Sequence, residues 1–323
     1  MLDPLGCRIV AALQCGPRNS WATIAEVLGE SDRTVSRRGR ELLESGEIKV
    51  VGVTGSTGAV ILRARCAVGA ARTVAGGLAR REDTTFVYAV TGQEDCVAEL
   101  WTDDAHLPEL VLDDLPHIAG IRRLRVDPVT MLYRSVREWR PSILTPREAA
   151  ALSPRPQVIH QPDGTSSADI SAIHRSILRI LQADGRTPLA DIARLVGITE
   201  NTARRHLDWL EVHHQSRLRV VVAPALLGFP AEAVAWVKVA PNNHDRLVSA
   251  LLDCSEVRYA AALGGADTLF VNLACQDRQK LHRIVTQSKW ARLARSVSLS
   301  TVLEATKRSG SRLQSTSSAA YLY

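Results

Sequence analysis

The sequence predicts an α+β chain of two similar halves, each with a three-helix unit followed by a domain of order β-α-β-β-α-β. Three observations lead there. The 323 residues suit several small domains better than one. Residues 9–14 align with residues 177–182, an offset of 168. In each half, helix-like periodicity gives way to apolar runs typical of strands.

The repeat extends well beyond one helix. Apolar residues four apart form matching helical stripes, namely Leu5, Ile9 and Leu13 in the first half and Ile173, Ile177 and Leu181 in the second. The same register pairs Arg18 with Arg186, Ile24 with Ile192, Gly29 with Gly197, Thr34 with Thr202, Arg37 with Arg205, and Leu42 with Leu210. Further on, residues 92–95 meet residues 264–267 at an offset of 172, so a short insertion separates the two aligned blocks.

Composition indicates a folded protein of a reducing compartment. Apolar residues make up 46% of the chain and charged residues 23%. Its six cysteines form no C-x-x-C pair, which suits the cytoplasm. The N-terminus lacks a secretory pattern and no apolar run approaches a membrane span, so export and membrane insertion are not expected. The net charge of +6 is compatible with a polyanionic partner but does not establish one.

The start of the first half has the pattern of a winged-helix-like helix-turn-helix domain. Gly29 ends the second helix, and Ser31 is placed to N-cap the third. In this arrangement the third helix enters the DNA major groove. Its predicted DNA-contacting residues are Ser31, Arg33, Thr34, Ser36, Arg37, Arg38 and Arg40. Arg37 and Arg38 are expected to contribute most.

The second half repeats this pattern with different polar residues. Gly197 closes its second helix and Thr199 opens the third. The predicted DNA-contacting residues here are Thr199, Asn201, Thr202, Arg204, Arg205 and His206. Such units also serve as plain packing or dimerisation domains, and residues 1–55 carry seven basic and seven acidic side chains, so the DNA-binding interpretation depends on local placement.

The rest of each half predicts a ferredoxin-like domain. In the first half the expected elements are strands 59–68, 84–91, 96–101 and 121–132 with helices 71–80 and 107–115. In the second they are strands 233–239, 257–263, 269–275 and 297–303 with helices 245–252 and 278–286. The expected domains are residues 1–57, 58–138, 169–224 and 230–307, with a linker over 139–168 and a flexible tail over 308–323.

These residues carry a family resemblance. The step Arg18-Asn19-Ser20, the run Ser31-x-x-Thr34-Val35-x-Arg37-Arg38 and the exit Glu44-Ser45-Gly46-x-Ile48 resemble the Lrp/AsnC regulators, as does Val90-Thr91-Gly92-x-x-Asp95 in the following domain. The second half departs from the family at residues 212–216, where the usual exit is missing.

The resemblance implies a regulator that binds double-stranded DNA and a small effector such as an amino acid. The effector is expected near two turns, at Gly92 and Asp95 and at Gly264 and Asp267, where glycine admits close approach and aspartate can accept from an ammonium group. It also implies that the two sensor domains pair within one chain as a covalent pseudo-dimer, and that chains form homo-oligomers.

The sequence lacks the common motifs of enzymatic chemistry. It contains no phosphate-binding glycine loop, HExxH, GxSxG or paired Cys/His spacing, so neither catalytic residues, nor a metal site, nor a cofactor is expected. An enzymatic alternative remains, because siroheme decarboxylases share this domain pairing. A metabolite sensor that does not bind DNA is a third interpretation.

Overall fold

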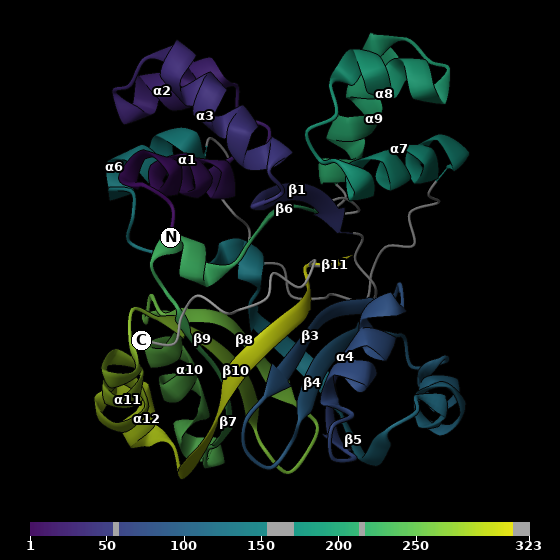
Figure 1. Cartoon of the computed structure of the whole chain (residues 1–323), viewed down its shortest axis with the longest axis vertical. Coiled ribbons are helices and arrows are strands. Elements are labelled where there is room, and N and C mark those ends of the chain that lie inside the picture. The colour runs from purple at the N-terminus through teal and green to yellow at the C-terminus, as the bar shows by residue number, and fades with distance from the viewer. Residues whose placement is uncertain (54–57, 154–170, 213–216, 313–323) are drawn as a thin grey trace. The chain divides into compact units, whose positions relative to one another are not determined.

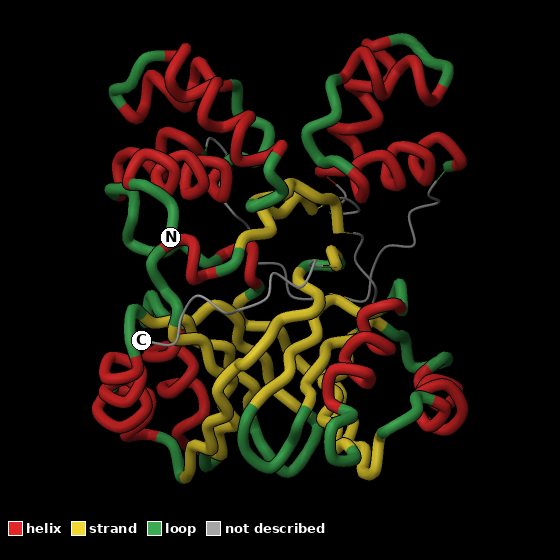
Figure 2. Tube along the Cα trace, in the orientation of Figure 1, coloured by secondary structure: helices red, strands yellow, loops and turns green. Residues whose placement is uncertain are grey.

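The computed structural model describes residues 1–53, 58–153, 171–212 and 217–312. The chain divides into two compact units that are not its two halves (Figure 1). Unit 1 comprises Met1–Gly55 and Val136–Pro230, and unit 2 comprises Ser56–Ser135 and Ala231–Tyr323. Each unit therefore takes one part from both halves. Unit 1 is mainly helical, whereas strands dominate unit 2 (Figure 2).

The first three-helix unit consists of α1 (Pro4–Cys15), α2 (Trp21–Leu28) and α3 (Asp32–Glu44). Its boundaries follow local chemistry. The Asp3 carboxylate, the Ser20 hydroxyl and the Ser31 hydroxyl each accept a backbone N–H at a helix start. Gly29 ends α2 with φ of 68°, a left-handed conformation that favours glycine. The expected helix-turn-helix is confirmed.

The second three-helix unit consists of α7 (Ala172–Ala183), α8 (Leu189–Val196) and α9 (Glu200–Val212). Its core contains Ile177, Leu181, Ile192 and Leu210, so the apolar stripe of α7 faces inward as expected. Gly197 ends α8 with φ of 76°, matching Gly29. Pro188 is the N-cap of α8, which begins at Leu189.

The strand after each three-helix unit pairs with its counterpart in the other half. β1 (Ile48–Val53) and β6 (Arg217–Val222) form an antiparallel two-stranded sheet within unit 1. Gly52 of β1 packs closely on Leu181 of α7, since a Cβ there would lie 3.1 Å from the Leu181 Cβ. The two helix-turn-helix units are therefore joined through their strands.

The expected linker over 139–168 is only partly correct. Trp139 is fully buried and meets Phe229 edge to face, and α6 (Pro146–Leu152) packs against α1 and α2. Thr145 and Glu148 form a capping box, which explains why a proline-rich segment forms a helix here. Residues 154–168 of the predicted linker lie outside the described residues.

Unit 2 contains two β-α-β-β-α-β modules, as predicted. The first has strands β2 (Ala59–Cys66), β3 (Thr84–Val90), β4 (Cys96–Trp101) and β5 (Ile121–Arg134), with helices α4 (Ala71–Arg80) and α5 (Leu107–Glu109), the latter continued by a π-helix over Leu110–Asp114. The second has strands β7 (Ala231–Lys238), β8 (Val257–Leu263), β9 (Leu269–Cys275) and β10 (Ser296–Arg308), with helices α10 (His244–Leu252), α11 (Arg278–Gln287) and α12 (Lys289–Leu293).

The two modules close into one ring of strands. β10 pairs with β3 as well as with β7, and β5 pairs with β8, giving the order β10-β3-β4-β2-β5-β8-β9-β7 and back to β10. One face of each four-stranded sheet packs on its own helices. The opposite face contains a buried aromatic cluster, in which Phe86 stacks with Tyr88 and Phe270. The two modules therefore pair within the chain.

An ion network is also buried in unit 2. Glu232 accepts from Arg258, 2.6 Å away, and from Arg308, and it also bonds Asn272. Burial alone would raise the pKa of the Glu232 carboxyl, but the charges of Arg308 and Arg258 lower it to about 2.

The expectation of a flexible tail from residue 308 is wrong at its start, because Arg308 is buried and β11 (Ser311–Arg312) pairs with β10. Residues 313–323 lie outside the described part of the chain.

Candidate nucleic-acid interface and effector turns

Helix α3 presents part of the predicted DNA-contacting set. Arg33, Arg37 and Arg40 are exposed, and Thr34 and Ser36 are half-buried. Ser31 is exposed, but its hydroxyl caps the helix by accepting from the Thr34 amide and shares a 2.7 Å hydrogen bond with the Thr34 hydroxyl. The available cations therefore lie along one helix, next to a capped N-terminus whose amides favour anions.

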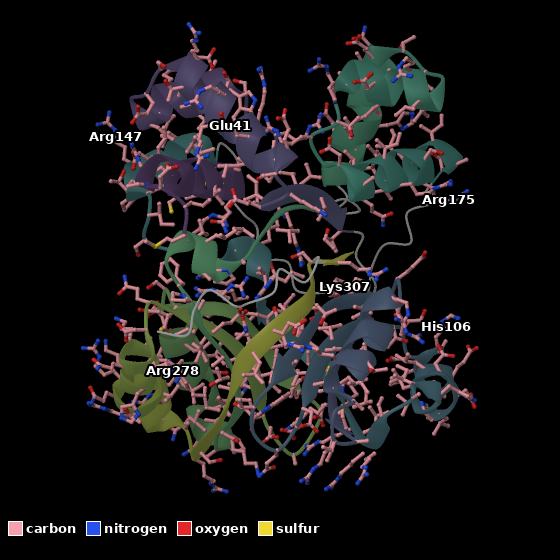
Figure 3. The ribbon with its side chains drawn as sticks, in the orientation of Figure 1. Glu41, His106, Arg147, Arg175, Arg278 and Lys307 are labelled. Atoms are coloured by element: carbon pink, nitrogen blue, oxygen red, sulfur yellow. The ribbon has the colours of Figure 1, made fainter. Side chains whose placement is uncertain are left out.

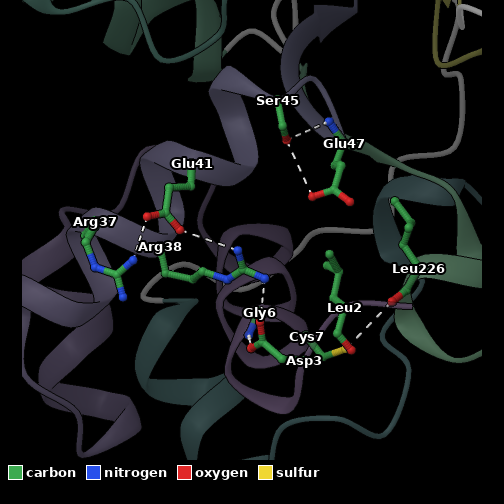
Figure 4. Close-up of polar contacts among 10 residues, drawn as sticks. All are labelled: Leu2, Asp3, Gly6, Cys7, Arg37, Arg38, Glu41, Ser45, Glu47 and Leu226. Atoms are coloured by element: carbon green, nitrogen blue, oxygen red, sulfur yellow. Dashed lines mark hydrogen bonds and ion pairs between the residues drawn. The ribbon is translucent and has the colours of Figure 1, made fainter.

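Arg38, also predicted to contact DNA, is half-buried and forms ion pairs within its own three-helix unit (Figure 4). Its guanidinium bonds the Asp3 carboxylate and also contacts Glu41, so it ties α3 to the start of α1. Arg37 pairs with Glu41 at 2.6 Å but keeps 63% of its side chain exposed. Glu41, labelled in Figure 3, thus lies between the two arginines expected to contribute most. Arg37 keeps the exposure a DNA contact requires, whereas Arg38 serves as a support.

Helix α9 presents a weaker cationic surface. Asn201, Arg204 and Arg205 are exposed, and Thr199 pairs with Thr202 as Ser31 does with Thr34. Residues 200–210 carry two arginines and two carboxylates, whereas the matching residues 32–42 carry four arginines and two carboxylates. The second unit therefore has less positive charge to offer DNA phosphates.

His206, also predicted to contact DNA, is half-buried and bonds a residue of the first helix of its own unit. Its Nδ1 lies 2.8 Å from Nε2 of His174, a buried residue of α7. The His174 ring stacks on Trp209 with 4.2 Å between centroids. His206 lies 168 residues after Arg38, which is the offset of the repeat. Both units therefore use this position to join their first and third helices.

Arg18 and Arg186 link the two helix-turn-helix units. They occupy matching positions of the repeat but were not among the predicted site residues. Arg18 donates to the backbone carbonyls of Gly185 and Thr187, at 2.7 and 2.9 Å. Arg186 donates in return to the carbonyls of Pro17 and Asn19, at 2.6 and 3.1 Å. The exchange has the reciprocity of a two-fold interface within one chain. Identical arginines at matching repeat positions were the available signal.

The first predicted effector turn is already well bonded. The Asp95 carboxylate accepts from the Cys66 amide at 2.8 Å. Gly92 has φ of 107°, and a Cβ there would lie 3.0 Å from the Ser300 hydroxyl. Both residues therefore have a structural role at this turn, which the sequence pattern alone did not reveal.

The second predicted effector turn contains charged contacts. Asp267 pairs with buried Arg63 at 2.8 Å and lies 3.9 Å from the Lys238 ammonium. Gly264 donates its amide to the Pro128 carbonyl, and a Cβ at Gly265 would lie 2.0 Å from an Asp127 carboxylate oxygen. The Asp267 carboxylate is therefore occupied by cationic side chains of the protein.

Unit 2 also contains a hollow of about 350 Å³, and none of its lining residues is a predicted site residue. It is lined by Arg81, Asp83, Trp101, Thr102, Asp103, His106, Glu109, Leu110 and Asp114. His106, labelled in Figure 3, is hydrogen-bonded to Asp103, which raises the pKa of the imidazole. Arg81 bonds both Asp83 and Asp114. The described residues contain no cluster of three or more His, Cys, Asp or Glu suited to a metal ion.

Comparison with known proteins identifies the class of the second three-helix unit. Residues 170–211 match the AsnC-type helix-turn-helix domain. An uncharacterised HTH-type transcriptional regulator of Pyrococcus horikoshii is 28% identical over 120 residues, which cover 37% of this chain and 76% of that protein. An HTH-type transcriptional regulator FL11 of Pyrococcus abyssi is 25% identical, over 35% of this chain and 76% of its own.

Among solved structures, the siroheme decarboxylase NirDL resembles nearly the whole chain. It has a TM-score of 0.60 and 10% identity, and the match covers 94% of this chain and 92% of that one. At this identity the likeness shows a common fold.

None of the described helices is long and apolar enough to cross a membrane.

The fold and the matched domain define a helix-turn-helix protein with paired ferredoxin-like domains. More particularly, residues 170–211 match the AsnC-type helix-turn-helix domain, and about a third of the chain is similar to HTH-type transcriptional regulators. The matched segment is the second three-helix unit, although that unit is the one that departs from the family pattern at its exit.

Proposed function

We propose that this chain regulates transcription by binding an imperfectly palindromic DNA site with α3 and α9, as one covalent molecule in the cytoplasm. The proposal depends on one observation: two helix-turn-helix units with different DNA-contacting helices, here called readers, are joined within one chain. The β1–β6 pairing and the reciprocal hydrogen bonds of Arg18 and Arg186 join them. A joined pair presents its two reader helices together, as DNA-binding dimers do. Because the exposed residues of α3 and α9 differ, their half-sites should differ as well.

The test is binding to DNA fragments selected from the source genome, with and without changes in each reader. Arg33→Ala with Arg37→Ala removes two exposed cations of α3, and Arg204→Ala with Arg205→Ala removes those of α9. Each pair should weaken protection of one half-site in a footprint. Arg147→Ala, an exposed arginine on α6, provides a matched control. Wild-type footprints for both reader variants would reject the proposal.

A small metabolite, by family resemblance an amino acid, is proposed to alter DNA affinity by preferring one of two states of the protein. Titration calorimetry against an amino-acid panel tests this, with Asp95→Asn and Asp267→Asn to test the two turns. Asp267→Asn also weakens the Arg63 ion pair, so its thermal unfolding is measured first. Identical binding by both variants would remove these carboxylates from effector recognition.

Siroheme decarboxylase chemistry is a second candidate, favoured by the nearly complete fold match to NirDL. That enzyme has also been solved with an iron-uroporphyrin III analogue. Absorption spectra recorded while iron-uroporphyrin is added would show a shifted Soret band if this chain binds it. A Soret shift in a protein that does not retard DNA would favour the enzyme, and retarded DNA with an unchanged spectrum would favour the regulator.

A further inference from the structure

Four arginines of the first ferredoxin-like module face one another across two strands. In the β2–β5 ladder, Arg63 lies opposite Arg125, and Arg65 lies opposite Arg123. Their neighbours Leu62, Ala64 and Cys66 pack on the helix-covered face, so the arginines of β2 lie on the other face. Like charges directly opposite each other on one face of a ladder are destabilising.

The inner pair is neutralised by aspartates. Arg63 has only 4% of its side chain exposed and bonds Asp127 at 2.7 Å and Asp267 at 2.8 Å. Arg125 also bonds Asp127, at 3.2 Å. The Arg63 guanidinium lies over the Trp236 ring, 3.6 Å from its centroid. Asp127 and Asp267 thus neutralise the inner pair, Arg63 and Arg125. Neither carboxylate pairs with the outer arginines.

The outer pair gains a third arginine from a bulge. The ladder jumps from Arg65 opposite Arg123 to Cys66 opposite Ile121, which leaves Arg122 without a partner position. Ile121 and Leu124 both pack on the helix-covered face. A bulge between them therefore directs Arg122 and Arg123 together toward the opposite face.

The three outer residues Arg65, Arg122 and Arg123, here called the arginine cluster, are all exposed. Within the described residues no carboxylate lies within 4.0 Å of them, since no ion pair involves any of the three. The nearby Asp95 carboxylate is held by the Cys66 amide. The cluster thus concentrates positive charge at the solvent-exposed end of the β2–β5 ladder.

The matching end of the second module has cations at two of these three positions, Lys238 and Arg295, but no arginines opposite each other. At the matching end of its ladder, Lys238 lies opposite Ser296 and Trp236 lies opposite Ser298. The module could therefore close its ladder without paired arginines. Their presence in one module only is not required by the fold.

We propose that the arginine cluster binds a small, multiply charged oxyanion, of the phosphate-ester or polycarboxylate class. Guanidinium groups form paired hydrogen bonds with such oxygens, and a ligand with two or more negative charges would offset the repulsion between Arg65 and Arg123. This site differs from the predicted effector turns in the sign of charge it selects. The proposal concerns binding alone and holds whether or not the chain regulates transcription.

The test compares the intact wild-type chain with Arg65→Gln/Arg123→Gln, using pyrophosphate and citrate as probes at constant ionic strength. Wild type should show a rise in melting temperature on adding a probe, because a ligand that binds the folded state stabilises it. The double variant should bind roughly tenfold more weakly or worse, and without ligand it should melt no lower than wild type. Arg278→Gln/Arg283→Gln, on the exposed face of α11, should behave as wild type.

Two results would overturn the proposal. One is an equal response to both probes in wild type and in the cluster variant. The other is a loss of duplex-DNA affinity in the cluster variant without any loss of pyrophosphate or citrate binding, which would assign the arginines to a DNA surface. A response to pyrophosphate but not citrate would support the phosphate-ester class, and the reverse would support polycarboxylates.

Discussion

The two helix-turn-helix units join their first and third helices with different residues. In the first, Arg38 of α3 bonds Asp3 at the start of α1, whereas in the second, His206 of α9 bonds His174 of α7. In the first, Trp21 packs over Gly39, and the matching positions of the second are Leu189 and Leu207. Helix caps and glycine turns are shared, while packing pairs have diverged. The shared caps and glycines thus give both units the same backbone fold, while the side chains that contact each other differ between the units.

DNA affinity should show the largest difference between the units. Replacing Arg33 and Arg37 by alanine should cost about 1 to 3 kcal/mol for each lost contact and reduce the salt dependence of binding. The Arg204/Arg205 double variant should cost less, because residues 200–210 carry no net positive charge. Fluorescence anisotropy over a salt series measures both. A larger loss from the α9 variant would make the second unit the principal reader.

The packing difference should appear as a stability effect of Gly39→Ala. A Cβ there would lie 2.4 Å from the Trp21 ring, so overpacking should cost about 1 to 3 kcal/mol although alanine favours helix. Adding Trp21→Leu should recover most of that loss, which urea unfolding can measure. Gly76→Ala in α4 is the matched control. Its Cβ would have only the Arg80 side chain nearby, at 3.8 Å, so a gain is expected.

The reciprocal arginines test whether the two units act as one. Arg18→Ala or Arg186→Ala should each lower the free energy of unfolding by about 1 kcal/mol, since each removes two charge-assisted hydrogen bonds at a partly exposed interface. The double variant should also bind its two half-sites with weaker coupling in a footprinting titration. Coupling equal to wild type would leave β1 and β6 as the sole connection that matters.

The Asp3–Arg38 pair should give the smallest effect. The Gly6 amide, together with Arg38, lowers the pKa of the Asp3 carboxyl below its usual value. Its stabilisation is therefore present above the unfolded-state pKa of about 3.9 and is lost as pH falls through the lower folded pKa. Because Asp3 is 48% exposed, Asp3→Asn should cost less than about 1 kcal/mol. Unfolding measured from pH 6 to pH 2 should show a shallower acid dependence in this variant, and an unchanged slope would contradict the assignment.

The sequence by itself determined the elements and their repetition. Helix 71–80 and strands 96–101, 257–263 and 269–275 were predicted to the residue, because caps, glycines and periodicity act over a few neighbouring positions. It also located the exposed Arg33, Arg37 and Arg40 of α3, since a helix face follows from spacing.

Only the tertiary structure decided which residues meet across long separations. Nothing local to Arg38 indicates that Asp3 binds it, and nothing near Asp267 indicates Arg63. The pairing of β1 with β6 and the closure of β10 onto β3 join segments of opposite halves, more than 150 positions apart in the sequence. Hydrogen bonding between strands and ion pairing depend on distance in space, which a periodic pattern along one chain does not encode.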